Sequence, residues 1–362
     1  MTMKKRNNIF LLLATILLVS CIDEIKFNND LIDPELVING FPSRDSIITI
    51  QVGASKPIPG TQNNFTWIDD ANVVLYVNGE EKETLEATAI NYAGSDDYYV
   101  GSANLPDTEY RAKTIATPGN VYKLVVTHPD YKTASCETII PEVVSISGIT
   151  ATTEYIQEEY STDKVLKFKL KFKDPADEKN YYRLTLKYTT GTWQSYNYED
   201  PEDTSGIIYV QHNVPGYGFS TEDPVLNPDE DANDFLFDSP SNEYNLFNDD
   251  LINGTEYELK FSLYVDSYYN YDNNQEPVSH VGEFYRVTLN LSSLTREAYL
   301  YIKSAATQLY YGIDIFSEPT QVFSNVENGT GIFGGYSSSI DSVAEGEYPV
   351  EGIHYEYYDY YY

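Results

Sequence analysis

The sequence is short of basic residues and of histidine, and each shortage excludes a class of function. Lys and Arg together number 23 against 56 Asp and Glu, so the formal net charge is −33. A chain this acidic repels phosphate backbones and anionic lipid headgroups, which argues against nucleic acid as a partner. The four histidines stand apart in the sequence, and none has metal-ligand spacing to another.

Sequence motifs of enzymes are also missing. The chain has no nucleophile elbow, no HExxH motif and no glycine-rich phosphate loop. A glycosidase needs two carboxylates about 5–10 Å apart. With 56 acidic residues some pair always meets that condition, so it does not discriminate. We therefore expect a protein that is not an enzyme.

Only one stretch is strongly apolar, and it is too short to span a membrane. Ile9 to Val19 is a run of 11 residues, whereas a spanning helix needs roughly 20. Three basic residues precede this run, and Ser20 and Cys21 follow it. Residues 1–20 are therefore predicted to be a secretory signal peptide.

The end of this segment, Leu18-Val19-Ser20-Cys21, resembles the lipobox of bacterial lipoproteins. The resemblance implies that Cys21 becomes the new N-terminus and carries acyl chains. These chains would anchor the protein stably, because each buried CH₂ contributes about 0.8 kcal/mol. The alternative is an ordinary cleaved signal followed by a chance cysteine. Loss of residues 1–20 leaves 20 basic and 56 acidic residues, a formal charge of −36.

The acidic pair that follows the cysteine, Asp23 and Glu24, resembles the surface-export signal of Bacteroidota lipoproteins. The resemblance implies an outer-membrane protein that faces the cell exterior, and the alternative is one that faces the periplasm. With Cys21 lipidated, Cys136 has no partner for a disulfide within the chain. Its alternating surroundings predict a buried, inert thiol on a strand.

The remaining composition predicts a mainly β fold. The chain has 35 Tyr, and β-branched residues are plentiful. Residues 21–34 are expected to be a lipid-anchored tether. In residues 35–143 about seven short alternating stretches predict an immunoglobulin-like β-sandwich. It includes a hairpin with a type I′ turn at Asn78-Gly79.

Residues 144–340 are predicted to form a second β-rich domain. Within it, "VLKFKLKFKD" alternates strictly, which indicates a half-buried strand with an apolar face and a row of lysines: Lys167, Lys169, Lys171 and Lys173. The lysine row is either a solvated face or a partner site. A helix is expected near 295–310, capped by Thr295 and with apolar spacing at Ala298, Ile302, Ala305, Ala306 and Leu309.

Long polar insertions are expected at 190–207, 216–254 and 266–280, and loops of this length are usually functional or mobile. Two of them carry aromatic clusters that either stack on a sugar or peptide ligand or pack against the sandwich: Trp193, Tyr196, Tyr198, Tyr268, Tyr269 and Tyr271. The third places oxygen ligands at alternating positions, which suits calcium: Asp229, Asp231, Asn233 and Asp234. This loop is not an EF-hand, and the alternative is a solvated acidic loop.

The last residues, 341–362, form an acidic, Tyr-rich tail. It is predicted to be either a disordered extension or a segment that packs on the second domain or on a partner through Tyr357, Tyr358, Tyr360 and Tyr361. Two short sequences, Asp45-Ser46-Ile47 and Asp341-Ser342-Val343, resemble the Bacteroidota O-glycosylation sequence. The resemblance implies glycans on Ser46 and Ser342.

Four stretches carry a wider family resemblance: "LVINGFPSRDSIITIQVGASKPI", "ANVVLYVNG", "GNVYKLVVTHPDYKTASCETIIPEVVSI" and above all "DIFSEPTQVFSNVENGTGIFGGYSSS" near the C-terminus. They resemble the Bacteroidota family labelled domain of unknown function 4249. By itself, "NVENGTGIFGG" is either a loop that docks a partner or a structural clasp that closes the second domain.

The resemblance implies an outer-membrane lipoprotein that assists a TonB-dependent receptor, and it transfers no catalytic residues. The alternative function is that of a structural or adhesive, fimbria-like surface protein. Neither the sequence nor the resemblance identifies a ligand.

Overall fold

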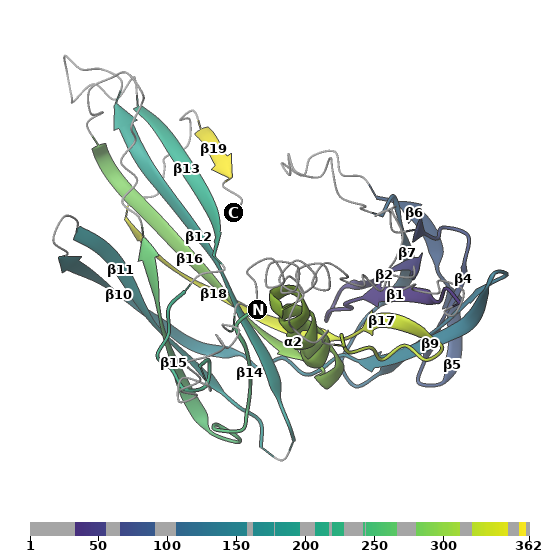
Figure 1. Cartoon of the computed structure of the whole chain (residues 1–362). Coiled ribbons are helices and arrows are strands. Elements are labelled where there is room, and N and C mark those ends of the chain that lie inside the picture. The colour runs from purple at the N-terminus through teal and green to yellow at the C-terminus, as the bar shows by residue number, and fades with distance from the viewer. Residues whose placement is uncertain are drawn as a thin grey trace, which may run out of the picture. The chain divides into compact units, whose positions relative to one another are not determined.

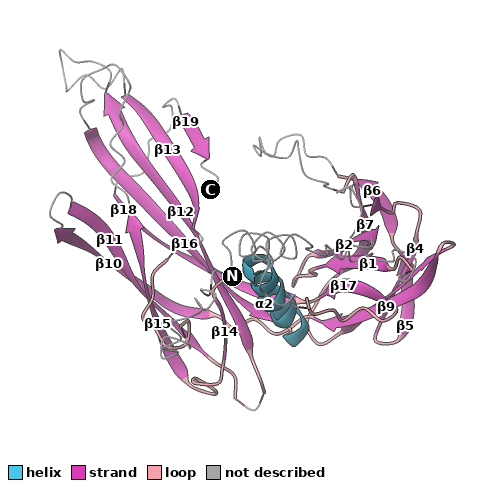
Figure 2. Ribbon diagram, viewed as in Figure 1, coloured by secondary structure: helices cyan, strands magenta, loops and turns pink. Residues whose placement is uncertain are grey.

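The computed structural model describes residues 33–55, 66–90, 106–157, 162–176, 178–195, 207–216, 219–227, 242, 244–265, 280–311, 321–346 and 355–359. Strands dominate these residues (Figure 1). One helix accompanies them (Figure 2). The prediction of a mainly β fold with a helix near residue 300 is confirmed.

The N-terminal sandwich consists of two sheets. The first sheet is built from β1 (Leu36–Gly40), β2 (Ile47–Ala54), β3 (Thr66–Trp67), β6 (Glu86–Ala89), β7 (Thr108–Ile115) and β17 (Gly329–Phe333). Its order is β17-β1-β2-β7-β6, with β3 paired to β2. The second sheet contains β4 (Asn72–Val77), β5 (Glu80–Thr84), β8 (Val121–His128) and β9 (Tyr131–Ile139) in the order β5-β4-β8-β9.

Alternate residues of these strands point inward and share one apolar core, as period-2 patterning requires. Cys136 belongs to this core and is 4 % exposed. Burial raises the pKa of its thiol to about 12, so the thiol stays protonated at neutral pH. The predicted burial of Cys136 is confirmed, and its raised pKa agrees with the prediction of an inert thiol.

The predicted hairpin turn joins β4 to β5. Asn78 and Gly79 both have positive φ, at 53° and 86°, and the flanking residues Val77 and Glu80 are paired. A type I′ turn requires positive φ at both central residues, which Asn-Gly adopts at low cost. The turn prediction is therefore confirmed.

Glu83 on β5 links the two sheets, because its carboxylate accepts hydrogen bonds from β7. The donors are the Thr114 amide at 2.8 Å, the Thr114 hydroxyl at 2.5 Å and the Lys113 amide at 2.9 Å. Burial alone would raise the pKa of Glu83, but these bonds outweigh it and hold the pKa below its ordinary value.

We expect Glu83→Gln to lower the free energy of unfolding by about 1–2 kcal/mol at pH 7, because an amide cannot accept all three bonds. A lowered folded-state pKa stabilises the protein above pH 4.5, the ordinary value for Glu. This contribution disappears as the pH falls through the folded pKa. Urea titrations should therefore show a wild-type advantage that shrinks below pH 4.5. Glu80→Gln, at an exposed position on the same strand, is the control, and an equal loss in both variants would contradict the prediction.

The second sandwich also pairs two sheets. The smaller sheet has the order β10-β11-β15, from β10 (Ile146–Gln157), β11 (Thr162–Lys173) and β15 (Glu256–Val265). The larger sheet is built from β12 (Tyr181–Ser195), β13 (Ile207–Gly216), β14 (Leu246–Asn248), β16 (His280–Leu294), β18 (Tyr336–Gly346) and β19 (Tyr355–Asp359). Its order is β18-β16-β12-β13-β19, with β14 paired to β12.

The strand β11 shows the expected two faces. Leu166, Phe168, Leu170 and Phe172 are at most 1 % exposed and belong to the core of the second sandwich. The four lysines between and after them are exposed. The alternation therefore predicted correctly which face of this strand is buried.

The helix α2 (Arg296–Tyr311) begins after Thr295, whose hydroxyl accepts the amide N–H of Ala298 at 3.3 Å. The predicted cap is confirmed. Ala298 is fully buried, but Leu309 is 64 % exposed, so the predicted apolar face was extended too far along the helix. Within the described part of the chain, no helix has both the length and the apolar composition to cross a membrane.

The segment predicted to be a clasp closes the N-terminal sandwich rather than the second domain. Strand β17 pairs in parallel with β1, although the two come from opposite ends of the chain (Figure 1). Glu327, just before β17, also exchanges two backbone hydrogen bonds with Ser135 of β9. The segment thus extends the first sheet beside β1 and bonds to the edge strand β9 of the second sheet, and the fully buried Phe333 joins the core.

The C-terminal tail contributes two strands to the second sandwich. Strand β18 runs through the predicted boundary at 341, and Tyr355–Asp359 forms β19, parallel to β13. The backbone pairs Tyr357 with Gln211 and Tyr358 with His212. Of the three predicted alternatives, the backbone pairing of β19 favours a tail that packs on its own second domain, and the contacts of the tyrosine side chains stay a prediction. Tyr360 and Tyr361 lie outside the described residues.

Candidate functional site

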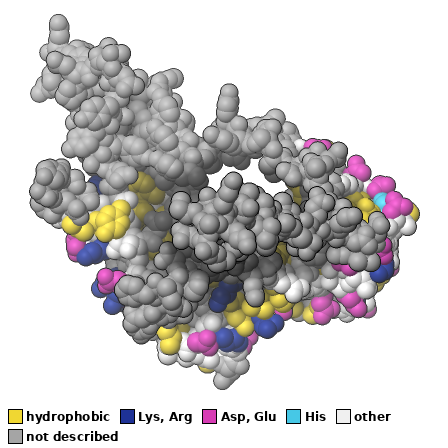
Figure 3. Space-filling view, in the orientation of Figure 1, with side chains coloured by type: hydrophobic (Ala, Val, Ile, Leu, Met, Phe, Trp, Pro, Cys, Tyr) yellow, Lys and Arg dark blue, Asp and Glu magenta, His cyan; other side chains and the backbone are white. Residues whose placement is uncertain are grey.

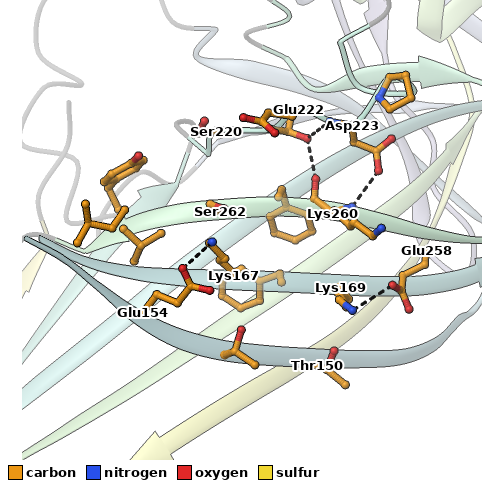
Figure 4. A pocket seen from close by; sticks show the side chains of 18 of the residues that line it. Thr150, Glu154, Lys167, Lys169, Ser220, Glu222, Asp223, Glu258, Lys260 and Ser262 are labelled. Atoms are coloured by element: carbon orange, nitrogen blue, oxygen red, sulfur yellow. Dashed lines mark hydrogen bonds and ion pairs between the residues drawn. The ribbon is translucent and has the colours of Figure 1, made fainter.

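An open groove of about 1000 Å³ lies on the outer face of the sheet β10-β11-β15 (Figure 4). Its base is formed by side chains that point away from the core, and one side is bounded by residues 220–224, which run beside β15. A groove is the kind of feature that binds ligands, because convergent side chains from several elements meet in one concave surface.

The strand register places polar side chains in rows across the sheet. One row joins Thr152 of β10 to Lys167 of β11 and Ser262 of β15, and the next joins Thr150, Lys169 and Lys260. All six residues line the groove. Each row crosses three strands because neighbours in register lie on the same face.

The bounding segment is held firmly to β15. Ser220 and Ser262 exchange two backbone hydrogen bonds, at 2.8 and 2.7 Å, and the Thr221 hydroxyl donates to the Lys260 carbonyl at 2.7 Å. The Asp223 carboxylate accepts the Lys260 amide N–H at 3.0 Å and the Tyr257 hydroxyl at 2.8 Å. This side of the groove is therefore preorganised, and ligand binding does not have to order it.

Acidic and basic side chains nearly balance inside the groove, and several of them form ion pairs. Lys167 Nζ lies 2.6 Å from Glu154, and Glu258 lies 3.5 Å from Lys169 and 3.4 Å from Lys171. Slight desolvation raises the pKa of Glu258, but the two lysines lower it below its ordinary value. On the described surface visible in Figure 3, acidic and basic side chains are interspersed.

One end of the groove is apolar and aromatic. Val165 faces outward, in register with Tyr264, yet it is only 1 % exposed. Tyr264 is 57 % exposed and Ile156 is 37 % exposed, and both line the groove. An exposed tyrosine beside a buried valine presents a flat apolar surface with a polar tip, which suits contact with an amphipathic ligand.

Below the groove, aromatic rings support the sheet. The rings of Phe168 and Phe261 stack with centroids 5.2 Å apart, and Phe219, just before the bounding segment, lies 4.9 Å from Phe261. Such ring contacts add roughly 0.5–1.5 kcal/mol each beyond burial. They fix the backbone positions from which the groove side chains project.

Most of the sequence-predicted site residues lie outside the described part of the chain. These are the lipidation and export residues Cys21, Asp23 and Glu24, the aromatic residues Tyr196, Tyr198, Tyr268, Tyr269 and Tyr271, and the calcium candidates Asp229, Asp231, Asn233 and Asp234. Among the described residues, no cluster of three or more His, Cys, Asp and Glu is arranged to hold a metal ion.

The expected loop position of Trp193 is wrong. Trp193 lies within β12, paired with Tyr209 of β13 and Gly282 of β16. The strand continues to Ser195 because it has hydrogen-bonded neighbours on both sides, and such pairing outweighs the local preference of a polar sequence.

The two predicted glycosylation sites are exposed. Ser46 lies in a turn, where the Ser43 hydroxyl donates to the Ser46 hydroxyl at 2.8 Å. Ser342 lies on the edge strand β18. Their exposure would allow O-glycosylation at both serines. The glycans themselves stay a prediction.

Of the groove residues, the sequence predicted only the lysines of β11, as part of either a solvated face or a partner site. Lys167 and Lys169 do line the groove, whereas Lys171 and Lys173 do not. Thr150, Thr152 and Tyr264 were missed. Their alternation on "ITATTEY" and "EYELKFSLYV" was a usable signal, but it gains meaning only when the strands are known to be neighbours.

A family model described as a domain of unknown function, DUF4249, matches residues 22–341. The chain belongs to this family. The match includes both sandwiches and the segment that returns to β1, so the DUF4249 region spans the whole described fold apart from the final residues.

No curated protein matches this DUF4249 chain. Two solved structures are distantly similar to it. The first, "Biofilm associated protein - B domain", has 7 % identity over 84 % of this chain and 85 % of that chain, with a TM-score of 0.17. The second, "Biofilm associated protein - BSP domain", has 8 % identity over 84 % and 58 %, with a TM-score of 0.18. Likenesses this distant carry no argument about fold or function.

Proposed function

We propose that this DUF4249 protein is a Bacteroidota lipoprotein of the outer membrane that faces the cell exterior and binds a ligand for a TonB-dependent receptor. In this proposal Cys21 carries the acyl chains, and Asp23 and Glu24 direct export to the surface. The chain binds and presents the ligand and catalyses no reaction.

The groove on the second sandwich is the observation that carries the binding role. It combines polar rows from three strands, a bounding segment held by backbone hydrogen bonds and an aromatic end. The proposed anchor precedes the first strand, since Cys21 lies 15 residues before Leu36. A chain anchored there would present both sandwiches outside the membrane.

The anchor is tested by Cys21→Ala in the native host. We expect the variant to leave the membrane fraction and to lose a palmitate-analogue label, because no other segment of the sequence is apolar enough to hold the chain. Cys136→Ala removes the other cysteine and is the matched control, which should stay in the membrane fraction and keep the label. Retention of Cys21→Ala in high salt and mild base would refute lipidation at this residue.

The accessory role is tested by solubilising outer membranes in mild detergent and purifying the wild-type protein through an affinity tag. We expect a large β-barrel protein to co-purify with it. An anchored protein that reproducibly purifies alone would favour the structural or adhesive alternative.

A further inference from the structure

We propose that the groove on β10, β11 and β15 binds an uncharged, polyhydroxylated ligand, namely a neutral oligosaccharide. This inference rests on the proposed binding function and names the class of ligand. The groove presents charges of both signs in near balance, hydroxyl groups and an exposed aromatic ring on one rigid face, and these three features together select for sugars.

The charge balance disfavours an ionic ligand. Glu154 compensates Lys167, and Glu258 lies between Lys169 and Lys171. Four acidic and three basic side chains line the groove, and Lys171 lies beside Glu258, so a charged ligand would meet repulsion as well as attraction and gain little. A sugar hydroxyl both donates and accepts, so it can bond to the carboxylate and the ammonium of one pair without separating them.

The hydroxyl groups add directional contacts. Thr150, Thr152 and Ser262 line the groove in register with the lysines of β11. The sheet spacing places such neighbours about 5 Å apart across the strands. A saccharide that lies across the sheet would meet a hydroxyl or an ammonium group on each strand in turn.

Tyr264 supplies the apolar part of the interaction. Its side chain is 57 % exposed at the end of the groove where the outward-facing Val165 is buried. A sugar ring has one face lined by C–H groups, and burying such a face against an aromatic ring removes apolar surface from water. The tyrosine therefore orients the ligand, and the polar rows form hydrogen bonds with its hydroxyl groups.

The size of the groove fits an oligosaccharide, and on the β15 side the backbone pairing leaves no edge for an added peptide strand. A volume of about 1000 Å³ lies at the upper end of the roughly 300–1,000 Å³ that small-molecule sites occupy, which gives room for several sugar units. A peptide that adds a strand needs a free sheet edge. Next to the groove, the edge of β15 at Ser262 is already hydrogen-bonded to Ser220.

The test uses the complete mature chain made soluble by Cys21→Ala, in affinity electrophoresis and isothermal titration calorimetry. The probes are neutral dextran, mannan and xylan and their oligosaccharides, acidic polygalacturonate and chondroitin sulfate, and a casein peptide digest. We expect at least one neutral glycan to bind, with an affinity that changes less than about twofold between roughly 0.05 and 0.5 M salt, because no net charge is neutralised.

Variants locate the site. Tyr264→Ala should weaken binding about tenfold or more, and Lys260→Met should weaken it severalfold, both with an unchanged Tm because both side chains are exposed. Tyr155→Ala is the matched control, since Tyr155 is 69 % exposed on β10 but does not line the groove. Its affinity should equal that of the unmodified chain.

Three outcomes would overturn the inference: binding of the acidic glycans or peptides alone, no binding of any neutral glycan, or equal affinities of the Tyr264→Ala and Tyr155→Ala variants. The accessory function is judged separately by β-barrel co-purification. A chain that co-purifies with the β-barrel but binds no neutral glycan would refute the ligand class and leave the accessory role standing.

Discussion

Gly331→Ala should lower the free energy of unfolding by about 3–5 kcal/mol. Gly331 lies in β17 with a φ of 109°, a conformation that residues with a side chain rarely adopt. An added Cβ would also collide with the Ile38 carbonyl oxygen and lie 2.9 Å from Asn39 Oδ1. Backbone strain contributes about 1–3 kcal/mol, and overpacking costs about as much again.

The loss is large because β17 holds two sheets together. Strand β17 covers the edge of β1, Glu327 bonds to β9, and the fully buried Phe333 fills the core between the sheets. If β17 cannot dock, β1 keeps an exposed edge and the core loses an aromatic side chain. An exposed strand edge also promotes aggregation, so we expect the variant to be less soluble.

Gly119→Ala separates the two causes. Gly119 has a φ of 79° but no neighbouring atom that a Cβ would meet. The Gly119→Ala substitution should lower the free energy of unfolding by only about 1–2 kcal/mol, because it introduces backbone strain without a steric collision. Chemical denaturation monitored by tyrosine fluorescence measures both variants. If Gly331→Ala were no more destabilising than Gly119→Ala, the close approach of β17 to β1 would be refuted.

Asp174→Ala should lower the free energy of unfolding by about 3–4 kcal/mol, because it removes buried hydrogen bonds from the second sandwich. Asp174 is fully buried after β11, and its carboxylate accepts the Tyr182 hydroxyl at 2.5 Å and the Gly254 amide N–H at 2.8 Å. Tyr182 is fully buried as well. The alanine would leave two donors without acceptors, and each such group costs about 1–3 kcal/mol.

Partner variants identify the cause of this loss. Tyr182→Phe should cost less than Asp174→Ala, because Gly254 still bonds to the carboxylate. The double variant should cost less than the sum of the single ones, since it removes donor and acceptor together. Asp250→Asn, at an exposed position near the same loops, is the control and should shift Tm very little. Additive losses in the double variant would show that the hydrogen bond does not stabilise the fold.

The local pattern of the sequence was sufficient wherever a residue's role depends on its neighbours in the chain. The strict alternation around Phe168 identified the buried face of β11, because side chains of a strand alternate between its two faces. Thr295 identified the helix start, and Asn78-Gly79 identified the turn, since capping and positive φ are properties of one or two residues. The surroundings of Cys136 likewise predicted its burial.

The sequence predicted less accurately the features that depend on contacts with distant parts of the chain. Residues 190–207 were expected to form a polar insertion, yet Trp193 lies in a strand because β13 and β16 pair on both sides of it. The apolar spacing of α2 suggested that Leu309 is buried, but Leu309 is 64 % exposed and does not belong to the apolar cluster that contains Ala298. In both cases tertiary contacts, rather than local preference, decided the outcome.

The sequence by itself determined the strand faces, the signal-like N-terminus and the strong negative charge of this protein. Only the tertiary structure decided that "GTGIF" pairs with β1, and that Thr150, Lys169 and Lys260 form one row of a groove. The physical reason is that hydrogen bonding between strands is made by the backbone, which is nearly the same for every residue. A strand's own sequence therefore specifies which side is buried but says little about which strand will lie beside it.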